Sequence, residues 1–357
     1  MPVTSDDALR FAIEQLAQGA SLDRRASAAA FEVVMAGEAS PVQIAALLMG
    51  LRAKGETPDE VAGAVLALRG AMSRFEVDDA DLLVDTCGTG GGQVGTLNIS
   101  TAAAFLVAGA GVGVAKHGNR SFTSRSGSAD VLEALGVNIN LSRHAAREAL
   151  RASGLTFLFA PTYHPAMRHA GPIRKQLGVS TIMNLLGPLA NPAGVGRQVV
   201  GVSERPRAEL IAATLAALRT KHALVVHAVI GMDEISPAGN TLVWEVRDNR
   251  VETWELEPAR FGLECGELSE LAGGEPAENA ARIERLLVRG EGKAIRCAVV
   301  LNAAAALYVS ANGWSFEEAA GRAARALDSG AAARVLAQLR QQAPADKNVD
   351  SKTGRGG

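Results

Sequence analysis

Apolar side chains in residues 1–73 recur with the spacing of helices, and no alternating pattern typical of a strand appears among them. The clearest helix starts are Ser40 before Pro41 and Thr57 before Pro58, because in each a capping side chain precedes proline at the first helical position. We therefore predict that this region forms four helices. Its expected role is packing or dimer formation.

From residue 82 onward the pattern changes to short apolar stretches that alternate with helical runs. We expect strands at 82–86, 112–115, 157–159, 198–202 and 223–228, followed by a hairpin of 241–246 with 251–256. We expect helices at 102–110, 142–153, 205–219, 277–289, 293–312, 315–328 and 330–341. Alternation of this kind predicts a mostly parallel sheet covered by helices.

The domain organisation follows from this change of pattern. Residues 1–73 are expected to form a small helical domain, joined by the helical segment 166–190, and residues 74–343 a larger α/β domain. Residues 344–357 hold almost no apolar side chain of any size, so they are predicted to be a disordered tail. The predicted fold class is α/β, with a small N-terminal helical domain beside the larger one.

Composition narrows the class of protein. The 357 residues are 48% hydrophobic with a formal net charge of -2, which suits a globular protein with a substantial core. A charge so close to zero argues against broad nucleic-acid binding. The chain starts with acidic residues where a signal peptide would be basic, and no apolar run is long enough to span a membrane. We expect a soluble, cytoplasmic protein without nucleic-acid or membrane partners.

The cysteines carry little predicted chemistry. Cys87, Cys265 and Cys297 are odd in number and have no CxxC spacing. Their pattern therefore predicts neither a disulfide framework nor a zinc site, and a reducing cytosol fits it best.

Glycines and polar side chains concentrate in one stretch of the α/β region. The glycines within 88–92 allow a tight turn whose backbone N–H groups can approach an anion. Hydroxyl and amide side chains at 98–101 open the following helix, whose positive end favours anions. The strand 112–115 would bring Lys116 and His117 to the same edge of the sheet. The stretch therefore predicts a phosphate cradle.

Two familiar phosphate motifs do not match this cradle. A P-loop requires Lys and then Ser or Thr directly after its last glycine, but Gly92 is followed by Gln93. The dinucleotide spacing occurs at Gly90, Gly92 and Gly95, yet no acidic residue lies about 20 positions further on. We interpret that spacing as a chance match within a glycine-rich loop.

Other motifs in this stretch resemble the signature of the anthranilate phosphoribosyltransferase family. They lie at 88–91, 98–101, 116–120 and 126–128. Later stretches agree in the same order, at 157–161, 163–165, 174, 184–189, 191–192 and 231–234. The match extends from about the N-terminal helices to near residue 340. One position departs from the family, because Gly92 stands where its loop usually ends in aspartate.

This resemblance implies a reaction. The 5-phosphoribosyl group of phosphoribosyl pyrophosphate would be transferred to the amine of anthranilate with release of pyrophosphate, the second step of tryptophan biosynthesis. Catalysis would depend on positioning and on stabilising the departing charge, with no catalytic base, because an aromatic amine is already neutral at pH 7. The resemblance also implies the fold shared by nucleoside phosphorylases and phosphoribosyltransferases, and a homodimer.

The resemblance further implies which residues contact each substrate. Those expected to bind phosphoribosyl pyrophosphate are Gly88, Thr89, Gly91, Gly92, Thr96, Asn98, Ile99, Ser100, Thr101, Lys116, His117, Gly118, Asn119, Ser124 and Ser128. Those expected to bind anthranilate are Gly88, Asn119, His164, Arg174, Gly187 and Pro188.

The residue types also bear on a metal site and on the role of Arg174. A bare pair of acids such as Asp233 and Glu234 would usually be a solvated loop, and only its partnership with a pyrophosphate site makes it a metal candidate. Asp233 and Glu234 follow the strand 223–228, and paired carboxylates at the carboxyl edge of a sheet suit Mg²⁺ beside substrate phosphates. The resemblance adds Ser100 as a ligand and implies two ions per subunit. Arg174 lies in a helical run with several cations, which would ordinarily be solvated. Its guanidinium can nevertheless hold a carboxylate through two parallel hydrogen bonds.

Two alternatives stay open at this point. A pyrimidine nucleoside phosphorylase shares the architecture, but its glycine loop resembles Lys-x-Ser-Thr-Gly-Gly, and the stretch 85–91 has no lysine. A non-catalytic relative that binds nucleic acid would be expected to have a net basic chain and degraded motifs at 116–119 and 233–234, and neither is seen. Loss of anthranilate fluorescence on adding phosphoribosyl pyrophosphate and Mg²⁺ would distinguish these possibilities.

Overall fold

The computed structural model describes residues 5–90, 95–121, 125–263 and 265–342. Among the predicted site residues, Gly91, Gly92 and Ser124 lie outside these ranges, as does the predicted tail. No helix within the described ranges is long and apolar enough to cross a membrane.

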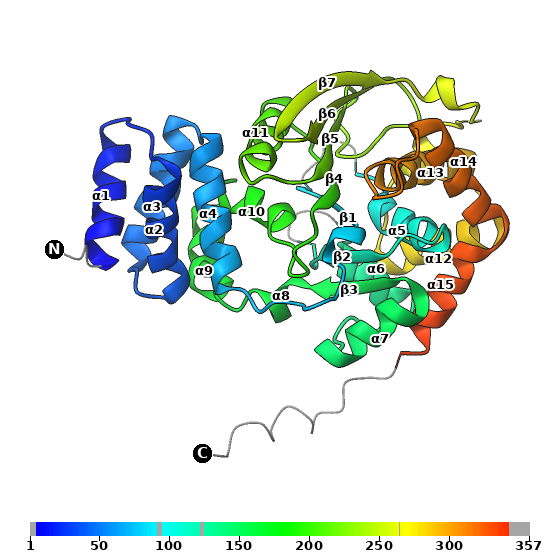
Figure 1. Ribbon diagram of the computed structural model, residues 1–357, viewed down its shortest axis with the longest axis horizontal. Helices are drawn as coiled ribbons and strands as arrows, with labels where there is room; N and C mark the ends of the chain where they lie inside the picture. The colour runs from blue at the N-terminus through cyan, green and yellow to red at the C-terminus, as the bar shows by residue number, and fades with distance from the viewer. Residues whose placement is uncertain (1–4, 91–94, 122–124, 264, 343–357) are drawn as a thin grey trace, which may run out of the picture.

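Four helices begin the chain, as predicted, and lie side by side at one end of the molecule (Figure 1). They are α1 (Ser5–Ala17), α2 (Arg24–Ala36), α3 (Pro41–Lys54) and α4 (Pro58–Ala71). The helix starts at Ser40 and Thr57 are confirmed. Each cap side chain accepts a hydrogen bond from the backbone N–H of the third helical residue, and the side chain of that residue accepts one from the backbone N–H of the cap. Proline follows each cap directly.

The strands form a mostly parallel sheet, as predicted. They are β1 (Asp85–Gly88), β2 (Val114–Gly118), β3 (Leu155–Phe159), β4 (Arg197–Gly201), β5 (His222–Ala228), β6 (Thr241–Arg247) and β7 (Arg250–Leu256). Five of them pair in the order β1-β4-β5-β6-β7. The β1–β4 and β4–β5 pairs are parallel, and the β5–β6 pair and the predicted hairpin pair β6–β7 are antiparallel. β2 and β3 pair in parallel, and a bridge between Val84 and Val114 joins them to the segment before β1.

Two strands extend further than predicted at their carboxyl ends. β1 runs to Gly88, and β2 runs to Gly118 because its parallel ladder with β3 continues to that residue. Lys116 and His117 are therefore strand residues, whereas the sequence had placed them just after a strand at 112–115.

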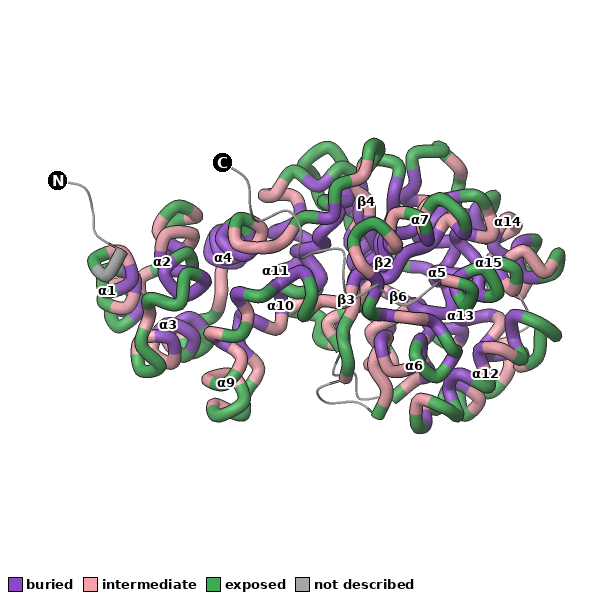
Figure 2. The backbone as a smooth tube through the Cα atoms, turned by 90° about the horizontal axis from the view of Figure 1, so that it is seen from below, coloured by how far each residue is buried: buried purple, intermediate pink, exposed green. Residues whose placement is uncertain are grey.

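The remaining helices cover both faces of the sheet (Figures 1 and 2). They are α5 (Ile99–Gly109), α6 (Ser128–Ala134), α7 (Arg143–Ser153), α8 (Ala160–Tyr163), α9 (Met167–Leu177), α10 (Met183–Leu189), α11 (Arg205–Ala217), α12 (Pro276–Arg289), α13 (Lys293–Tyr308), α14 (Phe316–Asp328) and α15 (Ala331–Arg340). α5 and α13 are buried along most of their length, which agrees with their nearly continuous apolar sequence (Figure 2).

The sheet separates two hydrophobic cores because successive side chains of a strand point to opposite faces. In β5, Leu224 and Val226 belong to the core that contains α5 and α13. Ala223 and Val225 belong to the other core, which contains α11, α10 and the N-terminal helices. The N-terminal helices therefore share a continuous core with one face of the sheet.

The segment 166–190 forms α9 and α10 and packs against the N-terminal helices, as we predict from the sequence. Ala170 and Leu186 lie in the same core as the N-terminal helices. The Arg69 guanidinium on α4 donates hydrogen bonds of 2.6 and 3.0 Å to the Leu189 carbonyl. Burial lowers the pKa of Arg69. The exact domain limits stay a prediction.

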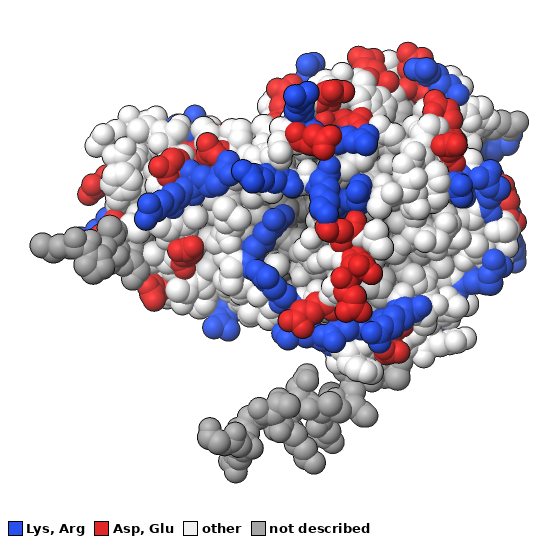
Figure 3. Space-filling model, in the orientation of Figure 1, with Lys and Arg blue, Asp and Glu red and all other residues white. Residues whose placement is uncertain are grey.

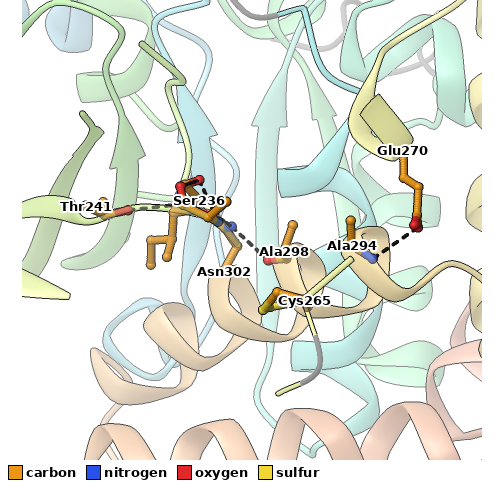
Figure 4. Close-up of a disulfide and its surroundings, with 10 residues drawn as sticks. Ser236, Thr241, Cys265, Glu270, Ala294, Ala298 and Asn302 are labelled. Atoms are coloured by element: carbon orange, nitrogen blue, oxygen red, sulfur yellow. Dashed lines mark hydrogen bonds between the residues drawn. A yellow bond between two sulfur atoms is a disulfide. The ribbon is translucent and has the colours of Figure 1, made fainter. Parts of the chain in front are cut away.

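One expectation about the cysteines is wrong. Cys265 and Cys297 form a disulfide, with their Cα atoms 5.3 Å apart (Figure 4). Cys265 lies in the connection after β7, which passes over the first turns of α13 and so meets Cys297. The two residues are 32 positions apart, and neither their number nor their spacing could reveal this tertiary contact. Cys87 is a free thiol.

Candidate active site

A cleft of about 1150 Å³ lies at the carboxyl ends of β1, β2 and β4, and α9 and α10 complete its wall. Figure 2 shows α9 and α6 on the same side of the molecule. The predicted residues that line it are Gly88, Thr89, Thr96, Asn98, Ser100, Thr101, Lys116, His117, Gly118, Asn119, Ser128, His164, Arg174, Gly187, Pro188, Asp233 and Glu234. The fold thus brings together residues that are up to 146 positions apart, from Gly88 to Glu234.

Ile99 is an exception among the predicted site residues. Its side chain is fully buried in the core beside α5, and it does not line the cleft. Its backbone N–H donates a 2.6 Å hydrogen bond to the Leu97 carbonyl. The Ile99 side chain therefore serves packing at the start of α5, and a contact between Ile99 and the substrate stays a prediction.

The described part of the glycine loop is tied to its surroundings. The Thr89 N–H donates to the Gly201 carbonyl at 2.9 Å, and the Gly90 N–H donates to Asp233 Oδ2 at 3.1 Å. Gly90 has a φ of +68°, a conformation that favours glycine. These two amides are therefore occupied in this structure, whereas the sequence had suggested bare N–H groups along the whole loop.

Side chains at the start of α5 supply further polar groups. Asn98 donates to the Ser126 carbonyl at 3.0 Å and accepts from Asn279 Nδ2 at 3.2 Å. The Thr101 hydroxyl is buried and has no hydrogen-bond partner among the described residues, although Thr101 lines the cleft. Because a buried hydroxyl without a partner is costly, it is well suited to bond a ligand oxygen.

Lys116 is buried between β1 and the start of α5. Its ammonium donates to the Thr86 carbonyl and lies 3.4 Å from the Ser100 hydroxyl. Burial lowers the pKa of Lys116, and the neighbouring Asp85 opposes that shift. Burial in turn raises the pKa of Asp85 to about 6, although it accepts a 2.7 Å hydrogen bond from Asn191. The pair is neutral overall when both groups are ionised, and its ammonium is the part that lies next to Ser100.

Asp233 and Glu234 form the acidic part of the cleft. Glu234 accepts from the Thr96 hydroxyl at 3.2 Å, while Asp233 accepts from Gly90. Burial raises the pKa of Asp233, and burial together with the Asp233 charge raises the pKa of Glu234 well above its usual value. Two buried carboxyls this close cannot both ionise easily, so the pair favours either a shared proton or a bound cation.

Glycines at the ends of β4 and β1 lie against the turn that carries Asp233 and Glu234, which we name the acidic turn. A Cβ atom at Gly201 would lie 1.6 Å from the Asp233 carbonyl oxygen. At Gly88 a Cβ atom would lie 3.1 Å from Asp233 Oδ2. The end of β4 can therefore hold this turn closely only because it ends in glycine, whereas a side chain at Gly88 would require only a small shift of the Asp233 carboxylate.

The donor set fits Mg²⁺ better than a softer metal. No group of three or more His, Cys, Asp or Glu that could hold a metal ion occurs in the described ranges. Two carboxylates with room for phosphate oxygens are what Mg²⁺ usually takes from a protein. The Lys116 ammonium near the Ser100 hydroxyl places a competing positive charge beside that predicted ligand.

The opposite wall, from α8, α9 and α10, carries cations and the ring of His164, which lies next to the ring of His117 on β2. The His117 and His164 ring centroids are 5.0 Å apart, and burial lowers the pKa of His117 to about 3 and that of His164 to about 4. Both rings are therefore neutral at pH 7. Arg174 is half-buried and Arg168 is exposed, and neither has an ion pair with a described residue.

Comparison with known proteins shows the family. The α/β domain profile of a glycosyl transferase family matches residues 80–333, and the helical bundle profile of that family matches residues 10–72. The anthranilate phosphoribosyltransferase of Pelotomaculum thermopropionicum is 48% identical over 331 residues, 93% of this chain and 95% of the relative.

The chain belongs to the anthranilate phosphoribosyltransferase family.

Solved structures of this family agree. The Thermus thermophilus enzyme has a TM-score of 0.86 and 41% identity, over 92% of this chain and 99% of that one. The Saccharomyces cerevisiae anthranilate phosphoribosyltransferase, solved in complex with PRPP and Mg, has a TM-score of 0.84 and 28% identity, over 94% of this chain and 97% of that one. These likenesses confirm the predicted fold class.

Asn302 is a cleft residue that sequence reasoning missed in this phosphoribosyltransferase. It extends from α13 toward the residues that follow the acidic pair (Figure 4). Its Oδ1 accepts from the Ile235 N–H at 3.0 Å, and its Nδ2 donates to the Ile235 carbonyl at 2.9 Å and to the Ala298 carbonyl at 2.8 Å. A lone asparagine within the apolar run 297–307 was the available signal.

Proposed function

We propose that the wall formed by the α/β part binds phosphoribosyl pyrophosphate and that the wall from α8 to α10 binds anthranilate. As an anthranilate phosphoribosyltransferase, the enzyme transfers the 5-phosphoribosyl group of phosphoribosyl pyrophosphate to the amine of anthranilate and releases pyrophosphate. The observation that carries the assignment of the walls is their charge. Buried carboxylates face the glycine loop, while arginines that have no ion pair within the described ranges lie across the cleft.

On the phosphoribosyl side, the polar groups lie where an anion needs donors. The Asn98 amide, the unpartnered Thr101 hydroxyl and the Lys116 ammonium would hold phosphate or ribose oxygens. Asn119 and Ser128 extend this surface along the cleft. These groups bind and orient the substrate, and fixed donors near developing negative charge also lower the barrier for its departure.

On the anthranilate side, Arg174 would hold the substrate carboxylate. Gly187 and Pro188 line the cleft nearby, and His164 contributes a neutral ring. Because both histidines stay neutral at pH 7, they would not repel or protonate the amine. Positioning the neutral amine is then the main task of this wall.

Asp233 and Glu234 would hold Mg²⁺, and Ser100 would contribute a further oxygen in the two-ion arrangement that we propose. When bound, the metal supplies positive charge that neutralises the pyrophosphate. The yeast relative solved with PRPP and Mg supports Mg²⁺ use by this family. In the chain itself, the hydrogen bonds from Gly90 and Thr96 orient the two carboxylates.

One assay tests this function directly. Purified protein is mixed with anthranilate, phosphoribosyl pyrophosphate and Mg²⁺, and the loss of anthranilate fluorescence is followed. We expect a loss that requires all three components. Phosphorolysis of thymidine, assayed in parallel, is expected to be absent. Thymidine phosphorolysis without anthranilate consumption would replace our proposal by the phosphorylase alternative.

A homodimer and a cytoplasmic location are further parts of the proposal. Apolar side chains of the N-terminal helices, Phe11, Val42 and Leu66, are exposed, and a second copy would cover them. Sedimentation of wild type and Val42→Glu would test this face, since a dimer formed through it should dissociate. A reducing cytoplasm would open the Cys265–Cys297 bond, so thiol alkylation in intact cells would test the location.

A further inference from the structure

A second pocket lies at the amino ends of the central strands, away from the cleft. It has a volume of about 540 Å³, and we name it the amino-edge pocket. Its lining residues are Arg197, Arg219, Thr220, Lys221, His222, Arg247, Asp248, Asn249, Tyr308, Ser310, Ala311, Gly313 and Trp314. Figure 3 shows Lys and Arg side chains, with Asp and Glu beside them, gathered over the β4 to β6 region of the sheet.

The amino-edge pocket has an excess of positive charge. Its lining contains Arg197, Arg219, Lys221 and Arg247 but only one acidic residue, Asp248. The charge of Lys221 is compensated by an ion pair with an aspartate outside the lining, so this cation is already used.

The other three cations have no carboxylate partner among the described residues. Arg197 donates to the carbonyls of Asp81, Val309 and Ser310, at 3.1, 2.8 and 3.4 Å. These bonds fix its guanidinium without neutralising it. For Arg219 and Arg247 the structure shows no ion pair within the described ranges.

The nearby carboxylate is not available to them. Glu245 accepts hydrogen bonds from His222 Nε2 at 2.8 Å, from the Tyr308 hydroxyl at 2.9 Å and from Trp254 Nε1 at 2.9 Å. These bonds occupy Glu245 and hold two rings of the pocket wall, His222 and Tyr308, in place. The wall is therefore ordered by its own hydrogen bonds, while the guanidinium groups are left for another anion.

Arg219 also has an unusual backbone conformation. Its φ is +59°, in the left-handed region that favours glycine, just after α11 ends. Four other helices, α2, α7, α9 and α12, end on a glycine in this same region: Gly37, Gly154, Gly178 and Gly290. A positive φ costs free energy at a residue other than glycine, so this conformation supports a role for the Arg219 side chain.

We propose that the amino-edge pocket binds a small organic anion through Arg219 and Arg247, with Arg197 as a fixed third cation. Guanidinium groups form paired hydrogen bonds with phosphate and carboxylate groups, so the ligand carries one of these. The volume is within the range of pockets for small molecules. This site is separate from the cleft, and the proposal does not depend on the transferase function.

The test uses full-length protein and two double variants. Arg219→Gln with Arg247→Gln removes the two free cations of the pocket. Arg285→Gln with Arg289→Gln is the matched control, because it removes two exposed arginines of α12 that line neither pocket. Calorimetric titrations with inorganic phosphate, phenyl phosphate and benzoate distinguish phosphate from carboxylate ligands. Wild type should bind at least one of these probes at a site outside the cleft. We expect the pocket variant to lose at least tenfold in affinity at that site and the control to match wild type.

A third variant separates binding from folding. Arg219→Gly removes the guanidinium and relieves the backbone conformation, so it should raise the melting temperature while weakening anion binding as the glutamine variant does. Equal binding of all three probes by wild type and both pocket variants would overturn the proposal, and so would equal losses in the control. Absence of any site in wild type other than the one that Arg174→Ala weakens would overturn it as well.

Discussion

The two walls of the cleft differ in how their polar groups are held. On the α/β wall, Asp233, Glu234, Asn98 and Lys116 all have hydrogen bonds within the protein. On the wall from α8 to α10, the Arg174 side chain is half-buried, and its guanidinium has no carboxylate partner in the described part of the chain. One wall is organised before the substrate arrives, whereas the other is completed by it.

This difference suggests how the enzyme divides its tasks. Fixed groups cost no reorganisation when charge develops, so they belong beside the departing pyrophosphate. A guanidinium without a partner gains most from a substrate that brings its own carboxylate, which makes it suited to selecting anthranilate. The predictions that follow disturb one wall at a time.

The largest effect is expected from the acidic pair. Asp233→Ala with Glu234→Ala should reduce turnover by about a thousandfold or more, since pyrophosphate charge would remain uncompensated. Folding should persist, because both carboxyls carry a burial cost that the change removes. Steady-state kinetics over a range of Mg²⁺ concentrations, with circular dichroism for the fold, provides the measurement. Near-normal kinetics at low Mg²⁺ would contradict the metal assignment.

On the other wall, Arg174→Ala should raise the KM for anthranilate and leave the KM for phosphoribosyl pyrophosphate nearly unchanged. Loss of a charge-assisted pair of hydrogen bonds costs about 1.5 to 3 kcal/mol, which is roughly ten- to 150-fold. Arg168→Ala is the matched control on the same helix, and we expect a smaller change because Arg168 is exposed. Equal shifts in both KM values would make Arg174 a residue of the phosphate side.

Asn302→Leu should disturb the backbone that follows the acidic pair, because the Asn302 side chain holds Ile235 in place. The backbone N–H and carbonyl of Ile235 would lose their partner, and turnover should fall about tenfold with a higher Mg²⁺ requirement. Asn279→Leu is the comparison, because the Asn279 amide donates a hydrogen bond to Asn98 at the start of α5 and has none to the acidic pair within the described ranges. That variant should mainly raise the KM for phosphoribosyl pyrophosphate. If both variants had the same Mg²⁺ dependence, the proposed separate roles of Asn302 at the acidic pair and of Asn279 at Asn98 would be wrong.

The neutral histidines predict a dependence of stability on pH. Their pKa values, lowered to about 3 for His117 and about 4 for His164, mean that below pH 6.5 the unfolded chain takes up protons that the native protein excludes. Their stabilisation is complete above pH 6.5 and is lost as the pH falls toward these values. Each contributes up to about 2 kcal/mol between pH 6.5 and 5.

Urea unfolding at pH 7.5 and 5.0 measures this contribution. The variant His117→Asn with His164→Gln should lose less stability between the two values than wild type. The comparison between variants is needed because Asp85, whose pKa is raised to about 6, takes up a native proton over the same range and opposes the trend. Parallel losses in both proteins would show that the two rings are protonated in the native state.

The smallest effect is expected at Gly92, which lies outside the described residues. The protein as it stands should have measurable activity, because the other substrate-binding motifs are present. Gly92→Asp should change mainly the affinity for phosphoribosyl pyrophosphate, measured by calorimetry. A wild type that binds neither substrate, together with turnover in Gly92→Asp, would show that this position had silenced the site.

Local pattern was enough to predict most of the fold, whereas most of the predicted residues that line the cleft came from the family resemblance. The caps at Ser40 and Thr57 and the hairpin of β6 and β7 follow from short-range chemistry, so the sequence shows them directly. The hairpin turn is an example, because Asp248 and Asn249 both have the positive φ that such turns require.

What the sequence could not show depends on contacts between distant segments. The amides of Thr89 and Gly90 are occupied by groups more than 100 residues away, at Gly201 and Asp233. Similarly, the Asn302 clamp on Ile235 joins positions 67 residues apart. A motif states which residue types are present, but only the packed sheet decides which of their hydrogen bonds are already used.

One hydrophobic core joins the N-terminal helices, the segment 166–190 and one face of the sheet. This shared core limits which parts of the gene can be exchanged between relatives. Recombination that exchanged only residues 1–73 between relatives would place foreign side chains against Ala170, Leu186 and Val225. The segments that pack in this core are therefore separate in the gene. Homologous exchanges should succeed most often when both pieces come from the same parent, a bias that sequencing of functional chimeras would reveal.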